Sequence, residues 1–293
     1  TDLHSLSSEQ QKQLFVVGRK VISRRKLNLS NDLGTNYKYD SNNVTYDRSS
    51  IHEYFNWIDD RPLIAVYSTS WFDYPHVYGE LFFTDVVDWI QTTFKTISEI
   101  RHFHWLLRPH PCDAWYKYYD LKKALPSVIP NHIGLAPLGW DGNEIENSVD
   151  ALVTLYGTAG LEYASIGKPV LVASQGWYGH VGFVQSPTSR DEYLKLLPSK
   201  WWLNLDLQKS IELSNLFAGW HFAVPSWQEN LIMYDDSKQD DIYEYFPMWL
   251  QENQRSIKDE ILQIRKWFKY SNNKSYHTFK IVHSQDFSIP SYN

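Results

Sequence analysis

The sequence holds a single cysteine, Cys112, among its 293 residues. One thiol excludes an internal disulfide and any metal site built from cysteines, and it favours a reducing, cytoplasmic location. No set of histidine and carboxylate residues has zinc-site spacing, so no metal is expected. No apolar run approaches the roughly 18 residues that a membrane span needs, and we expect neither a span nor a secretory signal.

Familiar nucleotide and hydrolase signatures are missing as well. No Lys-Ser or Lys-Thr pair follows a glycine loop, and no Gly-x-Gly-x-x-Gly run occurs, which argues against a P-loop enzyme and a redox dinucleotide. A Gly-x-Ser-x-Gly nucleophile elbow is also absent. The net charge of -6 gives no general attraction to nucleic acid or to an anionic membrane surface.

Aromatic residues are abundant, with 13 Trp and 20 Tyr in the chain. Flat rings stack on the apolar faces of sugars, so this composition suits a sugar-binding protein, but it also suits an aromatic-rich core. Apolar residues make up 43 % of the chain, which is enough for a substantial folded core.

The chain divides into three stretches. Residues 1–60 are polar and weakly patterned, with a predicted helix at 8–25 and a loop-like region at 29–50. We interpret them as a linker or as the remnant of another domain. Residues 61–200 hold the regular pattern described next. Residues 201–293 are predicted to be a helical extension, whose helix 249–270 carries an apolar stripe. Core packing is favoured for it over membrane contact because acidic residues offset the basic ones.

Residues 61–200 alternate between strands and helices. Short apolar runs predict five strands, and intervening helical patterns separate most of them; the strands are expected at 63–67, 103–107, 133–136, 151–155 and 169–173. This order predicts an α/β fold, a Rossmann-like doubly wound parallel sheet. Ligands bind such sheets beyond the carboxyl ends of the strands, so the loops after these strands are the candidate sites.

The fourth of these strands leads into a glycine-containing loop. Glycines let the backbone approach a ligand closely, and the following helix would direct its N–H groups at a phosphate. Thr158 would cap that helix and offer its hydroxyl to the same phosphate. Such glycines occur equally often in turns that bind no ligand. The candidate phosphate-binding residues are Gly157, Thr158, Ala159, Gly160 and Glu162.

The second strand leads into Arg108-Pro109-His110-Pro111. Two prolines hold His110 rigidly, and Arg108 is permanently charged, so the loop suits a phosphate or a carboxylate. We take Arg108, His110 and Pro111 as candidate phosphate-binding residues, with an ordinary surface turn as the alternative.

Two further loops carry polar or aromatic side chains. Asp73 and His76 follow the first strand and are the candidate acid, base or nucleophile, although Asp73 would equally serve to cap the next turn. After the fifth strand, three glycines among aromatic residues form a loop able to wrap a sugar or a base. Its candidate contacts are Trp177, Tyr178 and His180.

Taken together and in this order, these stretches resemble the bacterial capsule polysaccharide biosynthesis family, which includes retaining β-Kdo transferases. The likeness is carried by residues 71–73, 105–111, 156–164 and 176–179 and covers roughly 61–200. It implies a glycosyltransferase of the GT-B type, of which this region is the C-terminal, donor-binding half. His110 would match a His-Pro motif and Thr158 a later Ser/Thr motif, both contacting the phosphate of CMP. Glu162 would lie where related folds often bind ribose.

The resemblance further implies transfer of a sugar, Kdo from CMP-Kdo, onto a surface polysaccharide or lipopolysaccharide acceptor. The partners would be the nucleotide sugar, the acceptor glycan, a separate N-terminal acceptor domain and other assembly enzymes, with no resident cofactor and no nucleic acid. The protein would work in the cytoplasm, at the inner face of the bacterial inner membrane. The alternatives are a UDP-sugar transferase or epimerase of the same fold, and a non-catalytic domain for glycan binding or assembly.

Overall fold

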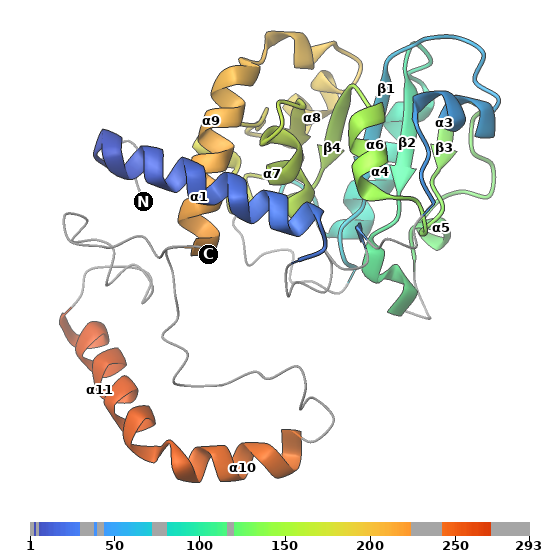
Figure 1. Cartoon of the computed structure of the whole chain (residues 1–293). Coiled ribbons are helices and arrows are strands. Elements are labelled where there is room, and N and C mark those ends of the chain that lie inside the picture. Colours follow the sequence, from blue (N-terminus) through green and yellow to red (C-terminus); the bar gives the residue numbers. More distant parts are fainter. Residues whose placement is uncertain are drawn as a thin grey trace.

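The computed structural model describes residues 3, 6–29, 38–39, 44–71, 81–115, 120–223 and 242–270. Five parallel strands form one sheet in the order β3-β2-β1-β4-β5 (Figure 1). The strands are β1 (Leu63–Tyr67), β2 (His104–Arg108), β3 (Ile133–Leu135), β4 (Ala151–Thr154) and β5 (Val170–Val172). The predicted α/β parallel sheet is confirmed, with all five strands within one or two residues of their expected bounds.

Both faces of the sheet are covered, because side chains along each strand alternate between two cores. Leu63, Ala65 and Tyr67 of β1 pack in one apolar cluster. Ile64 and Val66 pack in the other. A strand that is buried on both faces reads as a continuous apolar run, which is why these segments were recognisable without period-two alternation.

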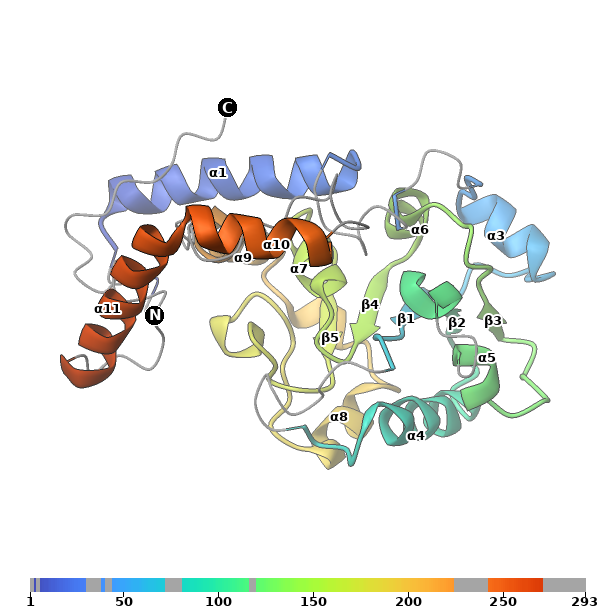
Figure 2. The same cartoon turned by 90° about the horizontal axis from the view of Figure 1, so that it is seen from below.

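Two layers of helices supply this cover, as the end-on view of the sheet shows (Figure 2). Caps fix several helix starts; Asp85, for example, accepts a hydrogen bond from the Asp88 N–H at the start of α4. One layer contains α1 (Ser8–Lys26), α3 (Arg48–Tyr54), α6 (Gly142–Ser148), α7 (Thr158–Ala164) and α9 (Leu207–Ala218). The other contains α4 (Val86–Ser98), α5 (Leu121–Ala124) and α8 (Arg190–Leu196).

Single helical turns complete this body. They are the 3-10 turns η2 (Pro111–Trp115), η3 (Gly179–Val181) and η4 (Trp201–Asn204), and the π-helical turn η5 (Gly219–Ala223). The turns η2 and η3 follow β2 and β5 along the chain, where two of the candidate loops were expected.

The N-terminal stretch packs on this body. Helix α1, predicted at 8–25, crosses α9 at backbone contact distance: a Cβ built on Gly18 would lie 1.8 Å from the Asn215 carbonyl oxygen. Helix α3 begins at Arg48, inside the region predicted to be a loop, with Asp47 as its cap. Residues 6–29 and 44–60 therefore help to cover one face of the sheet; the boundary at residue 60 itself stays a prediction.

The helix predicted at 249–270 is two helices, α10 (Ile242–Glu252) and α11 (Gln254–Tyr270), which cover neither face of the sheet in Figure 1. Ile261 and Leu262 of the predicted apolar stripe are 45 % and 52 % exposed, so the expectation of core packing is wrong for these two residues. Among the described helices, none is both long and apolar enough to cross a membrane.

Candidate functional site

The carboxyl ends of β1, β2, β4 and β5 carry the loops singled out in the sequence. His110 follows β2 by two residues and is partly exposed. Its Nδ1 accepts a hydrogen bond from the Cys112 N–H at 3.2 Å, which makes Nε2 the protonated nitrogen of the neutral ring. Pro111 starts the turn η2, whose geometry holds Cys112 in place. The loop thus presents His110 as a hydrogen-bond donor in a fixed tautomer.

Arg108 has a different environment from His110. Its side chain is 3 % exposed, and its two terminal nitrogens donate to the Tyr67 hydroxyl and the Trp140 carbonyl, each at 3.0 Å. No carboxylate among the described residues pairs with it. Arg108 therefore lies inside the protein and contributes a buried positive charge below the loops, rather than a side chain displayed in the loop beside His110.

The loop after β4 differs in one respect from its prediction. Gly157 is the N-cap of α7 without a side-chain cap, and Thr158 is the first helical residue, so the prediction that Thr158 caps the helix is wrong. Gly157 leaves the first N–H groups without a capping side chain, and the Thr158 hydroxyl makes no hydrogen bond to a described residue. Both, together with partly exposed Ala159, are available to a ligand.

The loop after β5 braces the loop after β4. Tyr178 is 1 % exposed and donates its hydroxyl to the Gly157 carbonyl at 2.7 Å, while the Trp177 indole donates to the Tyr156 carbonyl at 3.0 Å. A Cβ on Gly160 would lie 2.1 Å from the Tyr178 hydroxyl, so only glycine permits this contact. The predicted sugar contacts Trp177 and Tyr178 thus hold the backbone of the neighbouring loop. His180, in η3, is exposed.

Glu162 is buried one turn into α7, with 2 % of its surface exposed. Its carboxylate accepts from Arg25 Nε at 3.0 Å and from the Tyr39 hydroxyl at 2.9 Å, and it pairs with Lys38. Burial raises the pKa of this carboxyl, but Lys38 and Arg25 outweigh burial and lower the pKa to about 2. The residue expected at a ribose therefore joins the N-terminal stretch to α7. No local pattern marks its partners, which lie more than a hundred residues away along the chain.

Asp73 and His76 belong to residues 72–80, outside the described part of the chain. The last described residue before them is Trp71, whose indole donates to Asp113 Oδ1 at 3.0 Å. Asp113 Oδ2 also accepts from the Leu121 N–H at 3.3 Å, so one carboxyl group connects the loop after β1 with both ends of the segment after β2. Sequence reasoning missed Asp113, although its place three residues after His110 was a signal.

Burial raises the pKa of Asp113 to about 6. The pKa of Asp113 in the folded state lies above its ordinary value of 3.8. The protonated carboxyl therefore contributes its full stabilisation below pH 3.8, and this stabilisation is lost as the pH rises through 6. Urea unfolding of the wild type and Asp113→Asn, from about pH 4 to about pH 7, should show the variant gaining stability relative to the wild type as pH rises. A stability difference that does not change with pH would contradict this assignment.

Within the described residues, no group of three histidine, cysteine or acidic side chains is arranged to hold a metal ion. The polar groups described at this edge come from its loops: His110 in one, Gly157 and Thr158 in the next, with Tyr178 bracing the second loop. Donors of this kind suit a phosphate group.

No protein-family profile matches the sequence, and a search of the curated proteins found no significant match. The structure is similar to KpsC of Thermosulfurimonas dismutans, a beta Kdo 2,4 transferase, with TM-score 0.46 and 11% identity, over 72% of this chain and 55% of that one. It is also similar to the wall teichoic acid polymerase TagF, with TM-score 0.39 and 16% identity, over 65% and 45% of the two chains.

A third similar structure is the glycosyltransferase SnogD from Streptomyces nogalater, with TM-score 0.31 and 15% identity, over 54% of this chain and 40% of that one. The chain spans about half the length of the solved proteins it matches.

Proposed function

We propose that this chain is the donor-binding half of a GT-B glycosyltransferase that uses a CMP-activated sugar, with Kdo as the sugar and a bacterial surface polysaccharide as the acceptor. The observation that carries the proposal is the pair of loops beyond β2 and β4. They offer the donor nitrogen of His110, the uncapped N–H groups at Gly157 and the unused Thr158 hydroxyl at one edge of the sheet. These groups are hydrogen-bond donors, and the oxygens of a nucleotide phosphate are the acceptors that suit them.

In this proposal, the groups of the two loops stabilise the negative charge that develops on CMP as it leaves. Fixed donors are effective in this role because they do not have to reorganise during the reaction. The Cys112 N–H fixes the ring of His110, and Tyr178 fixes the carbonyl of Gly157, so both donors are held in advance. The buried charge of Arg108 adds a favourable potential from below, without contact to the phosphate.

A retaining double displacement also needs a carboxylate at the anomeric carbon and an acid or base for the acceptor hydroxyl. Asp73 and His76 are the candidates in this chain, since they follow the β1 strand in the sequence, and they lie outside the described residues. A partner acceptor domain would supply the acceptor site and would complete the active site.

The proposal predicts that the chain binds CMP and that His110→Ala weakens this binding by about ten- to a hundredfold, because a charge-assisted hydrogen bond is lost. Isothermal titration calorimetry with CMP and UDP measures both affinities. Exposed His102, which precedes β2 at the opposite edge, provides the control His102→Ala, which should leave CMP affinity unchanged.

Each outcome has a distinct meaning. Binding of UDP instead of CMP would replace the CMP donor with a UDP-sugar transferase or epimerase. Binding of neither nucleotide, by a chain that is folded, would overturn the donor-site proposal and favour a non-catalytic glycan-binding domain.

A further inference from the structure

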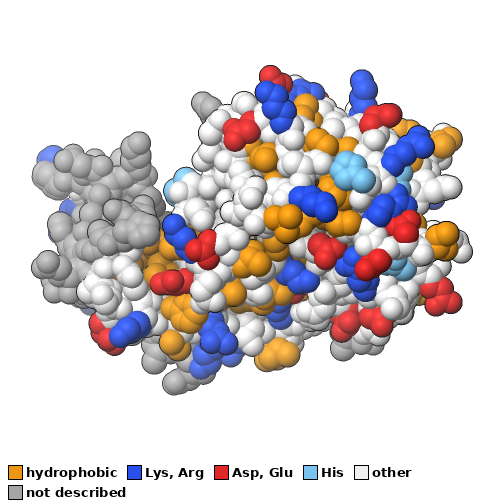
Figure 3. Space-filling model, turned by 90° about the horizontal axis from the view of Figure 1, so that it is seen from above, with side chains coloured by type: hydrophobic (Ala, Val, Ile, Leu, Met, Phe, Trp, Pro, Cys, Tyr) orange, Lys and Arg blue, Asp and Glu red, His pale blue; other side chains and the backbone are white. Residues whose placement is uncertain are grey.

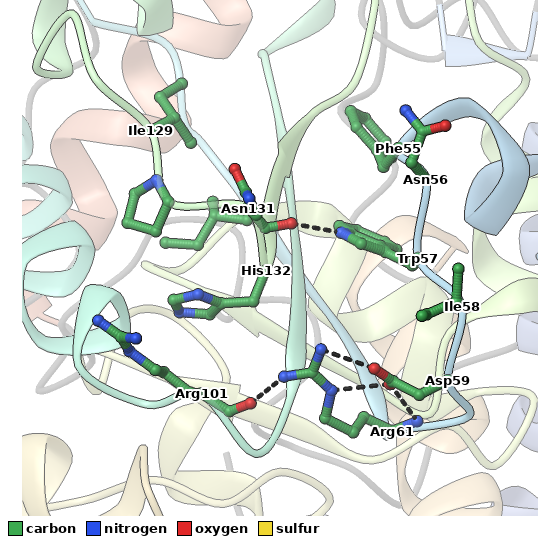
Figure 4. A pocket seen from close by; sticks show the side chains of 12 residues that line it. Phe55, Asn56, Trp57, Ile58, Asp59, Arg61, Arg101, Ile129, Asn131 and His132 are labelled. Atoms are coloured by element: carbon green, nitrogen blue, oxygen red, sulfur yellow. Dashed lines mark hydrogen bonds and ion pairs between the residues drawn. The ribbon is translucent and has the colours of Figure 1, made fainter.

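A second hollow lies at the opposite, amino-terminal edge of the sheet, with a volume of about 700 Å³ (Figure 4). It is lined by three segments: residues 55–59 and Arg61 ahead of β1, Arg101 ahead of β2, and residues 129–133 at the start of β3. This volume is in the range of small-molecule sites. The length of β1 separates it from the candidate donor loops, about 16 Å for five residues. It is therefore a site distinct from the one described above.

The walls of this hollow are locked together. The Trp57 ring stacks on His104 on one side, with centroids 4.3 Å apart, and on Phe55 on the other, at 4.8 Å. Its indole N–H donates to the Asn131 carbonyl at 2.6 Å, which ties the first segment to the third. These contacts make the cavity a preformed feature, which lowers the entropic cost of binding a ligand.

A second lock involves charged groups. Arg61 pairs with both oxygens of Asp59, at 2.7 and 2.8 Å, and also donates to the Arg101 carbonyl, which joins the first segment to the second. His104 Nε2 contacts Asp59 Oδ1 at 2.8 Å. The acid in the wall is thus already paired with two partners, and it offers little to a cationic ligand.

Other polar groups of the same hollow are unused. The guanidinium of exposed Arg101 and the side-chain amides of Asn56 and Asn131 make no hydrogen bond to any described residue. Beside them lie the apolar surfaces of Ile129 and Pro130, and of Ile58, which is 99 % exposed. Figure 3 shows the face of the molecule opposite to that in Figure 2, and apolar, histidine and charged side chains lie close together on it.

These groups define the chemistry of a ligand. Arg101 pairs with no acid among the described residues, so a ligand with an anionic group suits the hollow. The two amides can donate to and accept from hydroxyls, and the proline and isoleucine side chains suit the C–H face of a sugar ring. A nucleotide fits less well, because Trp57, the largest ring of the hollow, stacks on Phe55 and His104 and is only 7 % exposed, so it offers little surface to a base.

We propose that this hollow is a second glycan site, which binds an acidic oligosaccharide through Arg101, Asn56 and Asn131. The choice of an oligosaccharide rests on the proposed function, because a glycosyltransferase that elongates a surface polysaccharide handles such a chain. The site would hold a part of the acceptor remote from the reacting end and would raise its effective concentration at the donor edge.

The test uses the whole chain and two defined probes, trigalacturonic acid as the acidic saccharide and maltotriose as the neutral one. Calorimetric titration should show sub-millimolar to millimolar binding of trigalacturonic acid and weaker binding of maltotriose. Arg101→Ala and Asn131→Ala should each weaken the binding of trigalacturonic acid by about tenfold, because each variant loses one hydrogen bond to a charged or hydroxyl group. CMP affinity should not change in either variant.

Arg19→Ala removes an exposed arginine from α1, remote from the hollow in sequence, and is the matched control for general electrostatic attraction. An equal loss in this variant, or binding that disappears with moderate salt in all variants alike, would overturn the proposal. The proposal would also be overturned if neither saccharide bound; a protein segment would then be the better candidate for the hollow. Loss of CMP binding alone would contradict the proposed function and leave the second site standing.

Discussion

Replacing Gly18 with alanine is expected to lower the free energy of unfolding by about 2–3 kcal/mol or more, even though alanine is the better helix former. The added Cβ would lie 1.8 Å from the Asn215 carbonyl oxygen and 2.7 Å from the Gly219 nitrogen. Both are backbone atoms, so no side-chain rotation relieves the overlap and α1 must move away from α9. Urea unfolding followed by circular dichroism measures the loss.

Two further variants sharpen this experiment. Gly139→Ala is the control, because a Cβ there meets nothing within 4 Å, and its effect should stay within about half a kcal/mol. On the other side of the crossing, a Cβ on Gly219 would lie 2.1 Å from the Leu14 carbonyl oxygen, so Gly219→Ala should be comparably damaging. The double variant should lose less than the sum, since the first alanine already separates the helices. If Gly18→Ala matched Gly139→Ala, the close crossing of α1 and α9 would be refuted.

Replacing Glu162 with glutamine is expected to cost about 3–5 kcal/mol, as is typical when one partner of a buried ion pair is removed. Arg25 and Lys38 would both remain buried, at 6 % and 7 % exposure, without the carboxylate that neutralises them. Thermal or urea unfolding of the variant measures this loss. Glu53→Gln provides the control, because Glu53 is an exposed glutamate on α3 whose side chain makes no hydrogen bond or ion pair with a described residue.

The pH dependence of stability gives a second measure of the same contacts. The pKa of Glu162 is lowered from 4.5 to about 2, so its stabilising contribution is fully present above 4.5 and is lost as the pH falls through 2. The stability difference between wild type and Glu162→Gln should therefore shrink on acidification through this range. If the variant kept full stability but lost CMP affinity, Glu162 would be a nucleotide ligand after all, as the family resemblance implies.

Several features of the fold follow from local sequence alone. The runs at 63–67 and 151–155 are apolar and β-branched and were predicted as buried strands, because a strand covered on both faces has no polar position. Pro111 and Gly157 likewise indicated that loops follow the second and the fourth strand. Boundaries were less certain: α7 begins at Thr158, earlier than expected, because Gly157 acts as the N-cap in an extended conformation.

The roles of individual side chains depended on the tertiary structure. Arg108 was predicted to contact a phosphate, yet β2 directs it into the same layer as Tyr67, its register partner on β1, and both become buried. Strand parity was the signal for this, since Arg108 shares a face with Leu106 of the core. Tyr178 similarly became a brace because the loop after β5 folds back over the loop after β4.

By itself, the sequence determined the kind of layer architecture and the strand ends at which the candidate loops lie, since burial patterns and strand–loop–helix order are properties of short segments. Only the tertiary structure decided which of the polar residues are exposed in the candidate loops and which are buried in contacts that hold the protein together. Glu162 and Arg25 are 137 residues apart, and they meet because α1 packs on α9 through paired glycines. Long-range packing of this kind decides which distant partners a buried side chain meets, and no local pattern encodes those partners.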